Sequence, residues 1–216
     1  MNVVMKKLVE LRNFLVNSFV QRESEISGIL SALLAREACI LVGPPGTAKT
    51  RMLTALAKKI NCRIFQIWLS PETDEDALLG PLDIQKYREG KLTRIMEGFL
   101  PTADIVLIHE VFRGNRGVRD ALLSALEEKI VKIGGVEYPL RVLGFFFDTN
   151  FVSYDEEDQA FWDRMVIRCF VKYVSSDKWE DLLMTAIDLE ANNDNNAIMT
   201  REDIEFLQNA VRSRFL

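Results

Sequence analysis

The sequence is poor in the residues that mark metal centres, disulfide frameworks and membrane spans. It contains a single histidine among 216 residues, and its three cysteines lie far apart within apolar segments. One histidine without cysteines at ligand spacing argues against the usual zinc patterns, and an odd number of dispersed cysteines favours buried, reduced thiols. No apolar run approaches the roughly 20 residues of a membrane helix. These features predict a globular protein of a reducing compartment.

The chain also lacks a block of basic residues. It has 27 lysines and arginines against 32 aspartates and glutamates, which gives a formal net charge of −5. Proteins that bind nucleic acid strongly carry a concentrated basic surface, so this balance argues against a nucleic-acid motor. The first 20 residues mix charged and apolar side chains throughout, unlike a secretory signal. We expect a cytoplasmic location without membrane attachment.

What the sequence does contain is an alternation of strand-like and helix-like segments. Short apolar runs typical of buried strands are "ACILV", "RIFQIWL", "DIVLI" and "VLGFFF". Apolar residues at helical spacing lie between them, in residues 23–36 and 118–126. The stretch "KIVKIGGVEYPL" has β-branched residues on both sides of Gly134-Gly135, which is typical of a hairpin. The alternation predicts an α/β domain with a mainly parallel central sheet flanked by helices.

The character of the chain changes near residue 174. Beyond it we expect two helices separated by an asparagine-rich loop, the second beginning at a capping box of Thr200 and Asp203. The predicted division is therefore an α/β nucleotide-binding domain at 1–174 and a helical extension at 175–216. The extension is either short or the start of a truncated lid subdomain. The acidic run at 155–158 is expected to be a solvated loop.

The segment "GPPGTAKT", residues 43–50, follows the first predicted strand and precedes a helix. Backbone N–H groups of such a loop converge on phosphate oxygens, while a lysine reaches the outer phosphates and a hydroxyl ligates Mg²⁺. Lys49 and Thr50 would hold those roles. The strict pattern has glycine where this chain has Ala48, and alanine in a left-handed conformation costs about 1–2 kcal/mol. The loop must keep Ala48 at negative φ or tolerate strain.

Hydrolysis of a bound nucleotide needs polar side chains at the ends of neighbouring strands. Glu110 closes the segment "DIVLIHE", where a carboxylate can orient water for attack on the γ-phosphate. Asn150 ends the segment "VLGFFFDTN" and would reach the same crevice. Its alternative role is that of a turn-forming asparagine.

Taken together, these residues resemble a known family. The segments that carry the resemblance are "GPPGTAKT", "LLGPLDI", "GFLPTADIVLIHEVFRGN", "ALLSALEEK", "DTN" and "AFWDRMVIR". In order and spacing they are similar to the MoxR family of AAA+ ATPases, especially its regulatory-ATPase-variant branch, from about Gln21 to Tyr173. The resemblance implies a P-loop AAA+ core that binds ATP with Mg²⁺, and members commonly carry alanine at the position of Ala48. It implies nucleotide binding by Gly43, Pro44, Pro45, Gly46, Thr47, Ala48, Lys49, Thr50 and Arg51.

The same resemblance assigns roles to three further residues. It implies that Glu110 is the catalytic glutamate of the Walker B strand and Asn150 the sensor-1 residue. It also implies that Arg164, in preference to Arg168, is an arginine finger entering a neighbouring subunit. A finger acting in trans requires a homo-oligomeric ring, in this family a hexamer. The family further implies chaperone-like remodelling of a protein client, with a partner that bears a von Willebrand factor A domain.

One position departs from the family pattern, because the Walker B strand usually ends in Asp-Glu and here His109 replaces the aspartate. Three interpretations stay open. Hydrolysis survives because Thr50, the phosphates and waters hold Mg²⁺ while Glu110 acts. Alternatively, the chain is a nucleotide-dependent scaffold or switch with weak or no hydrolysis. In the third, His109 ligates a structural transition metal, although the chain has no other histidine and no cysteine at ligand spacing.

Overall fold

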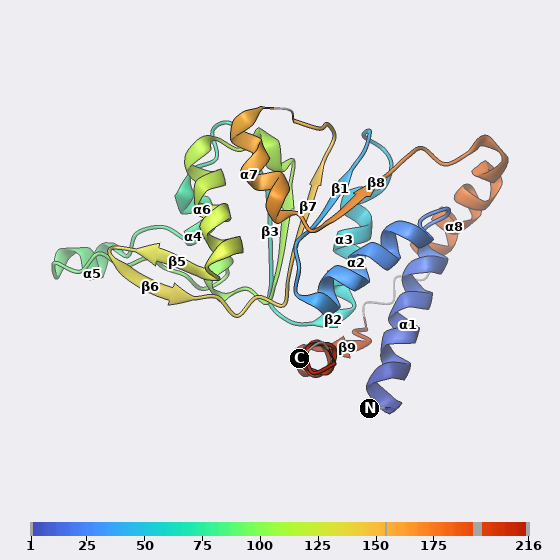
Figure 1. Cartoon of the computed structure of the whole chain (residues 1–216), viewed down its shortest axis with the longest axis horizontal. Coiled ribbons are helices and arrows are strands. Elements are labelled where there is room, and N and C mark those ends of the chain that lie inside the picture. The colour runs from blue at the N-terminus through green and yellow to red at the C-terminus, as the bar shows by residue number, and fades with distance from the viewer. Residues whose placement is uncertain (1, 154, 192–195, 215–216) are drawn as a thin grey trace.

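The computed structural model describes residues 2–153, 155–191 and 196–214. Its centre is a sheet of five parallel strands in the order β3-β4-β7-β1-β8 (Figure 1). The strands are β1 (Cys39–Val42), β3 (Ile64–Trp68), β4 (Ile105–His109), β7 (Gly144–Thr149) and β8 (Ile167–Phe170). The predicted α/β fold with a mainly parallel sheet is confirmed, and β8 is a strand that the sequence analysis did not identify.

Helices cover both faces of this sheet. On one face lie α1 (Asn2–Ser18), α2 (Glu23–Ala35), α3 (Lys49–Lys58) and α9 (Arg201–Arg212). On the other lie α4 (Glu75–Leu79), α6 (Arg116–Glu127) and α7 (Glu156–Arg164). Successive strand residues point to opposite faces, so Phe146 joins the first apolar cluster while Phe145 and Phe147 join the second. The two clusters form the core of a three-layer domain.

A lobe projects from one end of the sheet. It contains α5 (Ile84–Arg88) and the antiparallel hairpin of β5 (Ile130–Ile133) and β6 (Val136–Pro139), which Figure 1 shows at the left. Gly134 and Gly135 both have positive φ, as the predicted hairpin turn requires. The segment before β4 was expected to hold one short helix at most, but it forms both α4 and α5, followed by a short 3-10 helix at Leu100–Thr102.

The acidic run at 155–158 is not the solvated loop that we expected. It leads into α7, and Asp158 is only 2% exposed. The Asp158 carboxylate forms an ion pair with Arg119 on α6. A buried carboxylate needs such a partner, and one that lies 39 residues away is invisible to local patterns.

Beyond β8 the chain returns to the core. After a 3-10 helix at Ser176–Lys178 and the helix α8 (Trp179–Ala191), β9 (Met199–Thr200) pairs with β2 (Ile60–Asn61). The predicted capping box of Thr200 and Asp203 is present at the start of α9. Ile204 and Leu207 of α9 are buried in the same apolar cluster as α2. The division at residue 174 stays a prediction.

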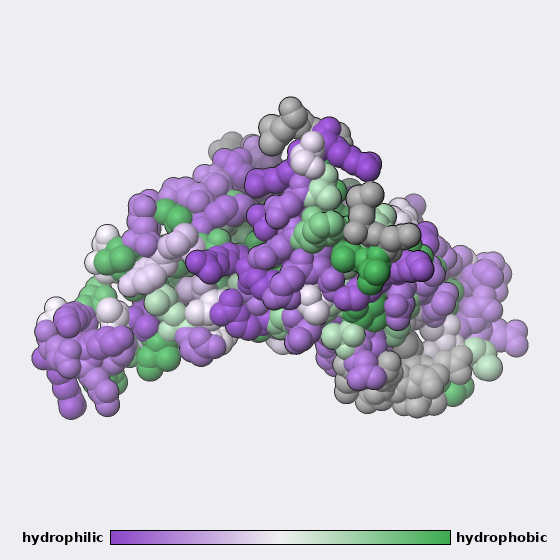
Figure 2. Space-filling model, turned by 90° about the horizontal axis from the view of Figure 1, so that it is seen from below, coloured by the Kyte–Doolittle hydropathy of each residue, from purple (hydrophilic) through white to green (hydrophobic). Residues whose placement is uncertain are grey.

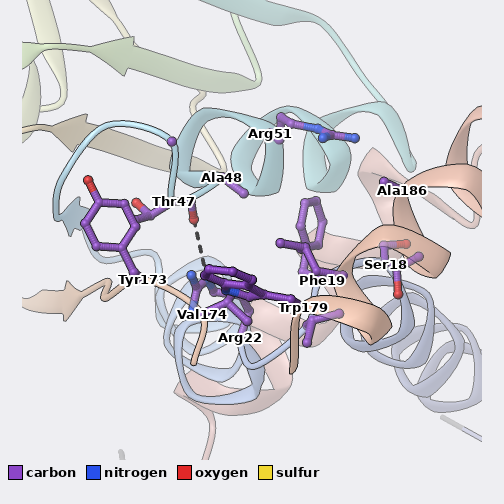
Figure 3. A pocket seen from close by; sticks show the side chains of 14 residues that line it. Ser18, Phe19, Arg22, Thr47, Ala48, Arg51, Tyr173, Val174, Trp179 and Ala186 are labelled. Carbon is purple, nitrogen blue, oxygen red and sulfur yellow. Dashed lines mark hydrogen bonds between the residues drawn. The ribbon is translucent and has the colours of Figure 1, made fainter. Parts of the chain in front are cut away.

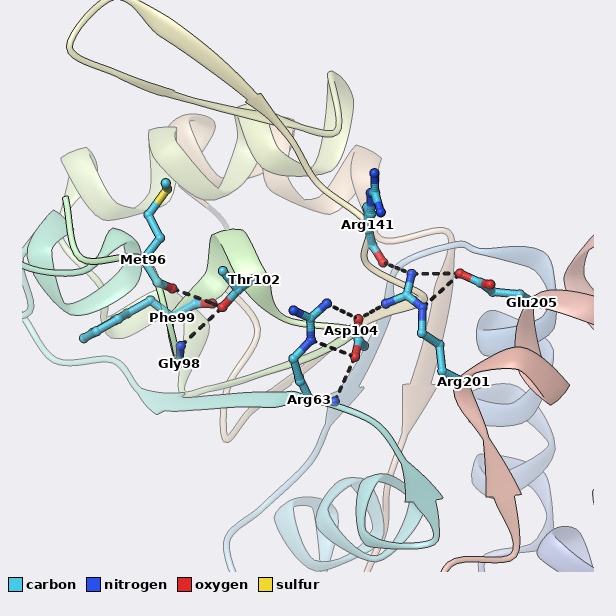
Figure 4. Close-up of polar contacts among 9 residues, drawn as sticks. All are labelled: Arg63, Met96, Gly98, Phe99, Thr102, Asp104, Arg141, Arg201 and Glu205. Carbon is cyan, nitrogen blue, oxygen red and sulfur yellow. Dashed lines mark hydrogen bonds and ion pairs between the residues drawn. The ribbon is translucent and has the colours of Figure 1, made fainter. Parts of the chain in front are cut away.

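The amino-terminal edge of the sheet is held by a network of ion pairs (Figure 4). Asp104, which precedes β4, accepts hydrogen bonds from Arg63 Nε at 3.2 Å and Nη2 at 3.0 Å. It also pairs with Arg201 of α9, which contacts Glu205 at 2.7 Å. The Asp104 side chain is 3% exposed, so both of its partners stabilise a charge that lies away from water. This network ties α9 to the starts of two strands.

The surface is largely hydrophilic. On the face that Figure 2 shows, hydrophobic residues occur in small separate groups among hydrophilic ones. Among the described residues, no helix combines the length and the apolar character that crossing a membrane requires.

The loop after β1 lies against the segment after β8. A Cβ atom added at Gly43 would stand 2.2 Å from the backbone oxygen of Val171, a distance that no side chain tolerates. Glycine at position 43 therefore allows two backbone segments to approach each other closely.

We predict that Gly43→Ala lowers the free energy of unfolding by about 1–3 kcal/mol, the usual cost of overpacking. Thermal or urea denaturation measures this change. Gly117→Ala is the control, because Gly117 lies in α6 and its added Cβ would meet no atom closer than 3.6 Å. An equal effect of both substitutions would contradict the close-approach argument.

Candidate functional site

The candidate site lies at the carboxyl edge of the sheet. Strand β1 stands between β7 and β8, so the chain order reverses there, and ligands of open α/β sheets bind at such a switch point. The loop of residues 43–48 joins β1 to α3 at this place. The predicted phosphate-binding loop therefore has the strand, the helix and the sheet position that its chemistry needs.

Two residues of this loop have left-handed backbone conformations. Gly46 has φ +80° with open space where a Cβ would stand, and Ala48 has φ +67° at the N-cap of α3. Of the two alternatives for Ala48, the structure shows the strained one. Backbone strain of this kind concentrates at ligand-binding sites.

Lys49 reaches back over the loop. Its Nζ donates to the backbone oxygens of Gly43 at 2.7 Å and Pro44 at 2.9 Å, and to Asn150 Oδ1 at 2.9 Å. Burial lowers the pKa of Lys49, and the nearby carboxylate of Asp148 opposes that shift. The Lys49 amino group thus lies between the loop and the end of β7.

Asn150 connects Lys49 to Glu110. Its Nδ2 donates to Glu110 Oε1, so both ends of its amide are used. Glu110 has φ +55° at the end of β4, and its Oε2 is buried without a hydrogen-bond donor among the described residues. Arg113 Nε lies 3.5 Å from this oxygen. A buried carboxylate oxygen with free lone pairs is suited to accept a hydrogen bond from water.

His109 is fully buried and both of its ring nitrogens are engaged. Nδ1 lies 2.6 Å from Asp148 Oδ2 on the neighbouring strand, and Nε2 lies 2.9 Å from Gln66 Nε2. The ring of Trp68 packs on the imidazole at a centroid distance of 4.6 Å. In the part of the chain that the structure describes, no group of three His, Cys, Asp or Glu side chains could hold a metal ion. This arrangement favours a hydrogen-bonded histidine over a metal ligand.

Asp148 is the functional candidate that the sequence analysis missed. Its Oδ2 accepts a hydrogen bond from the Thr50 hydroxyl at 2.9 Å, and its Oδ1 accepts one from the Glu110 N–H at 3.3 Å. The side chain is almost completely buried, with a residue exposure of 2%. The signal was present in "DTN", where an acidic residue stands two positions before Asn150 at the end of a buried strand.

A cavity of about 250 Å³ adjoins the phosphate-binding loop (Figure 3). Its walls come from the end of α1, the loop, the segment after β8 and α8, and they are mainly apolar: Phe19, Val20, Ala48, Val174, Trp179, Leu182 and Ala186. Arg51 on α3 also lines it. Arg22 joins the start of α2 to the loop, because its Nε donates to the Thr47 oxygen at 3.4 Å (Figure 3). The sequence alone does not bring these four segments together.

Arg164 is not part of this network. It lies at the end of α7, is partly exposed and forms an ion pair with Glu127 of α6. Arg168, the other candidate, donates from Nε to the backbone oxygen of Met165 at 2.9 Å and stacks near Trp162. Arg164 is therefore held by one side-chain ion pair, whereas the Arg168 guanidinium is tied to the backbone of its own chain.

The comparison with protein families agrees with this geometry. A family model described as the MoxR domain of MoxR-vWA-beta-propeller ternary systems matches residues 6–209. The chain belongs to the MoxR family of AAA+ ATPases. The resemblance that the sequence motifs carried is thereby confirmed.

This MoxR domain is similar to proteins from several organisms. An uncharacterized protein of Methanocaldococcus jannaschii is 34% identical over 203 residues, which are 94% of this chain and 54% of the relative. The chaperone MoxR1 of Mycobacterium tuberculosis is 27% identical over 121 residues, covering 56% of this chain and 31% of that protein. The chain spans about half the length of the Methanocaldococcus jannaschii relative and less than half of MoxR1.

A solved structure shares the fold. The crystal structure of a proposed ATPase from Cytophaga hutchinsonii superposes with a TM-score of 0.76 at 21% identity, covering 97% of this chain and 64% of the other. At this identity the likeness concerns the fold alone.

The residues of this MoxR domain fit a magnesium nucleotide. The Thr50 hydroxyl and the carboxylates of Asp148 and Glu110 are hard oxygen groups, which Mg²⁺ prefers. The open space at Gly46 leaves the loop backbone accessible, and the N-terminus of α3 favours anions. When bound, Mg²⁺ would supply charge neutralisation at the phosphates.

We predict that Trp179→Ala weakens binding of a fluorescent ATP analogue. Trp179 is 62% exposed and lines the cavity beside the phosphate-binding loop. If the base of the nucleotide enters this cavity, Trp179 can stack on it, and loss of such a stacked aromatic side chain costs about 1–3 kcal/mol. Fluorescence titration gives the dissociation constant. Tyr87→Ala removes an aromatic of similar exposure on α5 and should leave affinity unchanged; equal losses would argue that the cavity does not hold the base.

Proposed function

We propose that this chain is the ATP-binding and ATP-hydrolysing module of a MoxR-like protein-remodelling ring. The observation that carries the proposal is a single hydrogen-bonded network at the carboxyl edge of the sheet. It joins Lys49 and Thr50 at the start of α3 to Glu110, Asp148 and Asn150 at the ends of β4 and β7. A glycine-proline turn without a function would not be expected to lie beside so many polar groups joined by hydrogen bonds.

The network supports a division of labour between its members. Lys49 binds the outer phosphates in place of the three oxygens that it now contacts. Thr50 offers its hydroxyl oxygen to Mg²⁺, and Glu110 accepts a proton from the attacking water or orients it. Asn150 holds Glu110 through its Nδ2, and once Lys49 turns to the phosphates the Oδ1 of Asn150 can place the water. The backbone of residues 43–48 surrounds the phosphates, and the apolar cavity beside Trp179 takes the base and sugar.

Assembly into a homo-oligomeric ring, in this family a hexamer, is part of the proposal. Arg164 lies outside the network of its own chain, as a residue serving a neighbouring subunit would. The lobe supports contacts with other chains as well, because it exposes large apolar side chains: Leu82, Ile84, Tyr87, Leu92, Ile95 and Val136. Exposed apolar groups of this kind mark interaction surfaces. The matching family is described in systems with vWA and beta-propeller proteins, and we infer a protein bearing a vWA domain as partner and a protein as client.

The proposal predicts that Lys49→Ala and Glu110→Gln separate binding from hydrolysis. Lys49→Ala should lose most affinity for ATP, because it removes the cation at the outer phosphates. Glu110→Gln should keep affinity and lose hydrolysis, because an amide cannot accept the proton. Equilibrium binding of a fluorescent analogue and steady-state phosphate release measure the two effects.

An unchanged affinity of Lys49→Ala for ATP would contradict the assignment of residues 43–50 as a phosphate-binding segment. If the wild-type chain binds ATP, assembles and yet releases no phosphate, the chain is a nucleotide-dependent scaffold. Lys58→Ala is a suitable control for Lys49→Ala, because Lys58 is an exposed lysine of the same helix at the end away from the phosphate-binding loop.

A finger acting in trans predicts complementation between two inactive variants. Arg164→Ala should lower hydrolysis by about 10³–10⁵-fold, the usual worth of an arginine finger. Mixing it with Glu110→Gln should restore part of the activity, since some sites then combine an intact Glu110 with a neighbour's intact Arg164. An equal loss in verified monomers, or no recovery on mixing, would contradict the assignment.

A further inference from the structure

We propose that Asp148 performs the task that the Walker B aspartate has in MoxR relatives, and that His109 positions it. Where the family pattern implies a carboxylate at the end of β4, this chain has one at the paired position at the end of β7. This inference rests on the proposed function, because it assigns a residue of the same site its part in holding Mg²⁺.

The first argument concerns the proton of the Thr50 hydroxyl. A hydroxyl oxygen that gives a lone pair to Mg²⁺ must direct its hydrogen to another acceptor. In the structure that acceptor is Asp148 Oδ2, at 2.9 Å. Position 109 offers no oxygen for this purpose, and both nitrogens of its imidazole are engaged elsewhere.

The second argument concerns register. His109 and Asp148 are direct partners in the parallel pairing of β4 and β7, so their side chains leave the sheet on the same face and about 4.8 Å apart in the strand-to-strand direction. A carboxylate at either position is therefore near Thr50. Parallel pairing thus allows the anion to change strands without leaving the site.

The third argument concerns the role left to His109. Gln66 Nε2 donates to His109 Nε2, so the proton of the neutral ring is on Nδ1, which donates to Asp148 Oδ2 at 2.6 Å. A neutral imidazole orients the carboxylate without cancelling its charge. His109 is therefore a positioning residue, and the site keeps one anion at this level of the sheet.

The pair also explains why His109→Asp alone should not improve Mg²⁺ binding. Aspartates at both 109 and 148 would place two carboxylates side by side in a buried site, where like charges repel strongly. The site therefore needs one carboxylate and one neutral partner at these two paired positions, and either strand can supply the carboxylate.

The test is a Mg²⁺ titration of nucleotide binding, which is independent of hydrolysis. A fluorescent ATP analogue is bound to this chain in EDTA, and Mg²⁺ is then added in excess to obtain its apparent affinity. Asp148→Asn, with its own affinity in EDTA as the baseline, should require about 10- to 100-fold more Mg²⁺ than the wild type, the usual effect of losing an outer partner of a metal ligand. Asp104→Asn, which removes a buried carboxylate at the opposite edge of the sheet, should leave the Mg²⁺ requirement unchanged.

The exchanged pair His109→Asp/Asp148→His should restore the wild-type Mg²⁺ requirement, whereas His109→Asp alone should not match it. A wild-type Mg²⁺ requirement in Asp148→Asn would overturn the inference while leaving ATP binding intact. No binding of the analogue by the wild-type chain would overturn the proposed function itself. If Asp148→Asn does not fold, the exchanged pair decides, because it keeps the buried hydrogen bond: a retained Mg²⁺ requirement supports the inference and a lost one refutes it.

Discussion

The carboxyl edge of this molecule depends on the register between β4 and β7. That register sets His109 opposite Asp148 and, through β3, sets Trp68 opposite His109. A slip of one residue would turn every side chain of a strand to the other face. Asp148 would then lose Thr50, and Phe146 would leave its apolar cluster for the opposite one. The chemistry of the edge and the packing of both clusters are therefore specified by the same hydrogen-bonded ladder.

The burial of that edge determines how its polar groups behave. His109 and Asp148 are almost without solvent exposure, so the hydrogen bond between them replaces bonds that water would otherwise make. Such a network stays in one arrangement because any other leaves a buried group without a partner. The strained backbone of Ala48 and Glu110 adds to this, since those conformations persist only where the surroundings hold them.

Most of the fold could be predicted from the sequence because its signals are local. The apolar runs predict four of the strands. Gly134-Gly135 predicts the hairpin turn, and Thr200 with Asp203 predicts the start of α9. The sequence locates those candidate residues that come directly after a predicted strand, as Glu110 and Asn150 do. Asp158 and Asp148 escaped because their partners, Arg119 and Thr50, are 39 and 98 residues away. From the local sequence, an acidic residue next to a loop is predicted to be exposed to solvent. Only the register of the sheet shows that its side chain is buried beside a partner.

The ion pairs around Asp104 distinguish the amino-terminal edge of the sheet from its carboxyl edge. At the amino-terminal edge, Arg63 and Arg201 fasten the starts of β3 and β4 to α9, and separating buried charges of this kind is costly. At the carboxyl edge, strands run into loops. Helix α9 is therefore anchored at the edge of the sheet away from the phosphate-binding loop, and the residues of the candidate site take no part in these ion pairs.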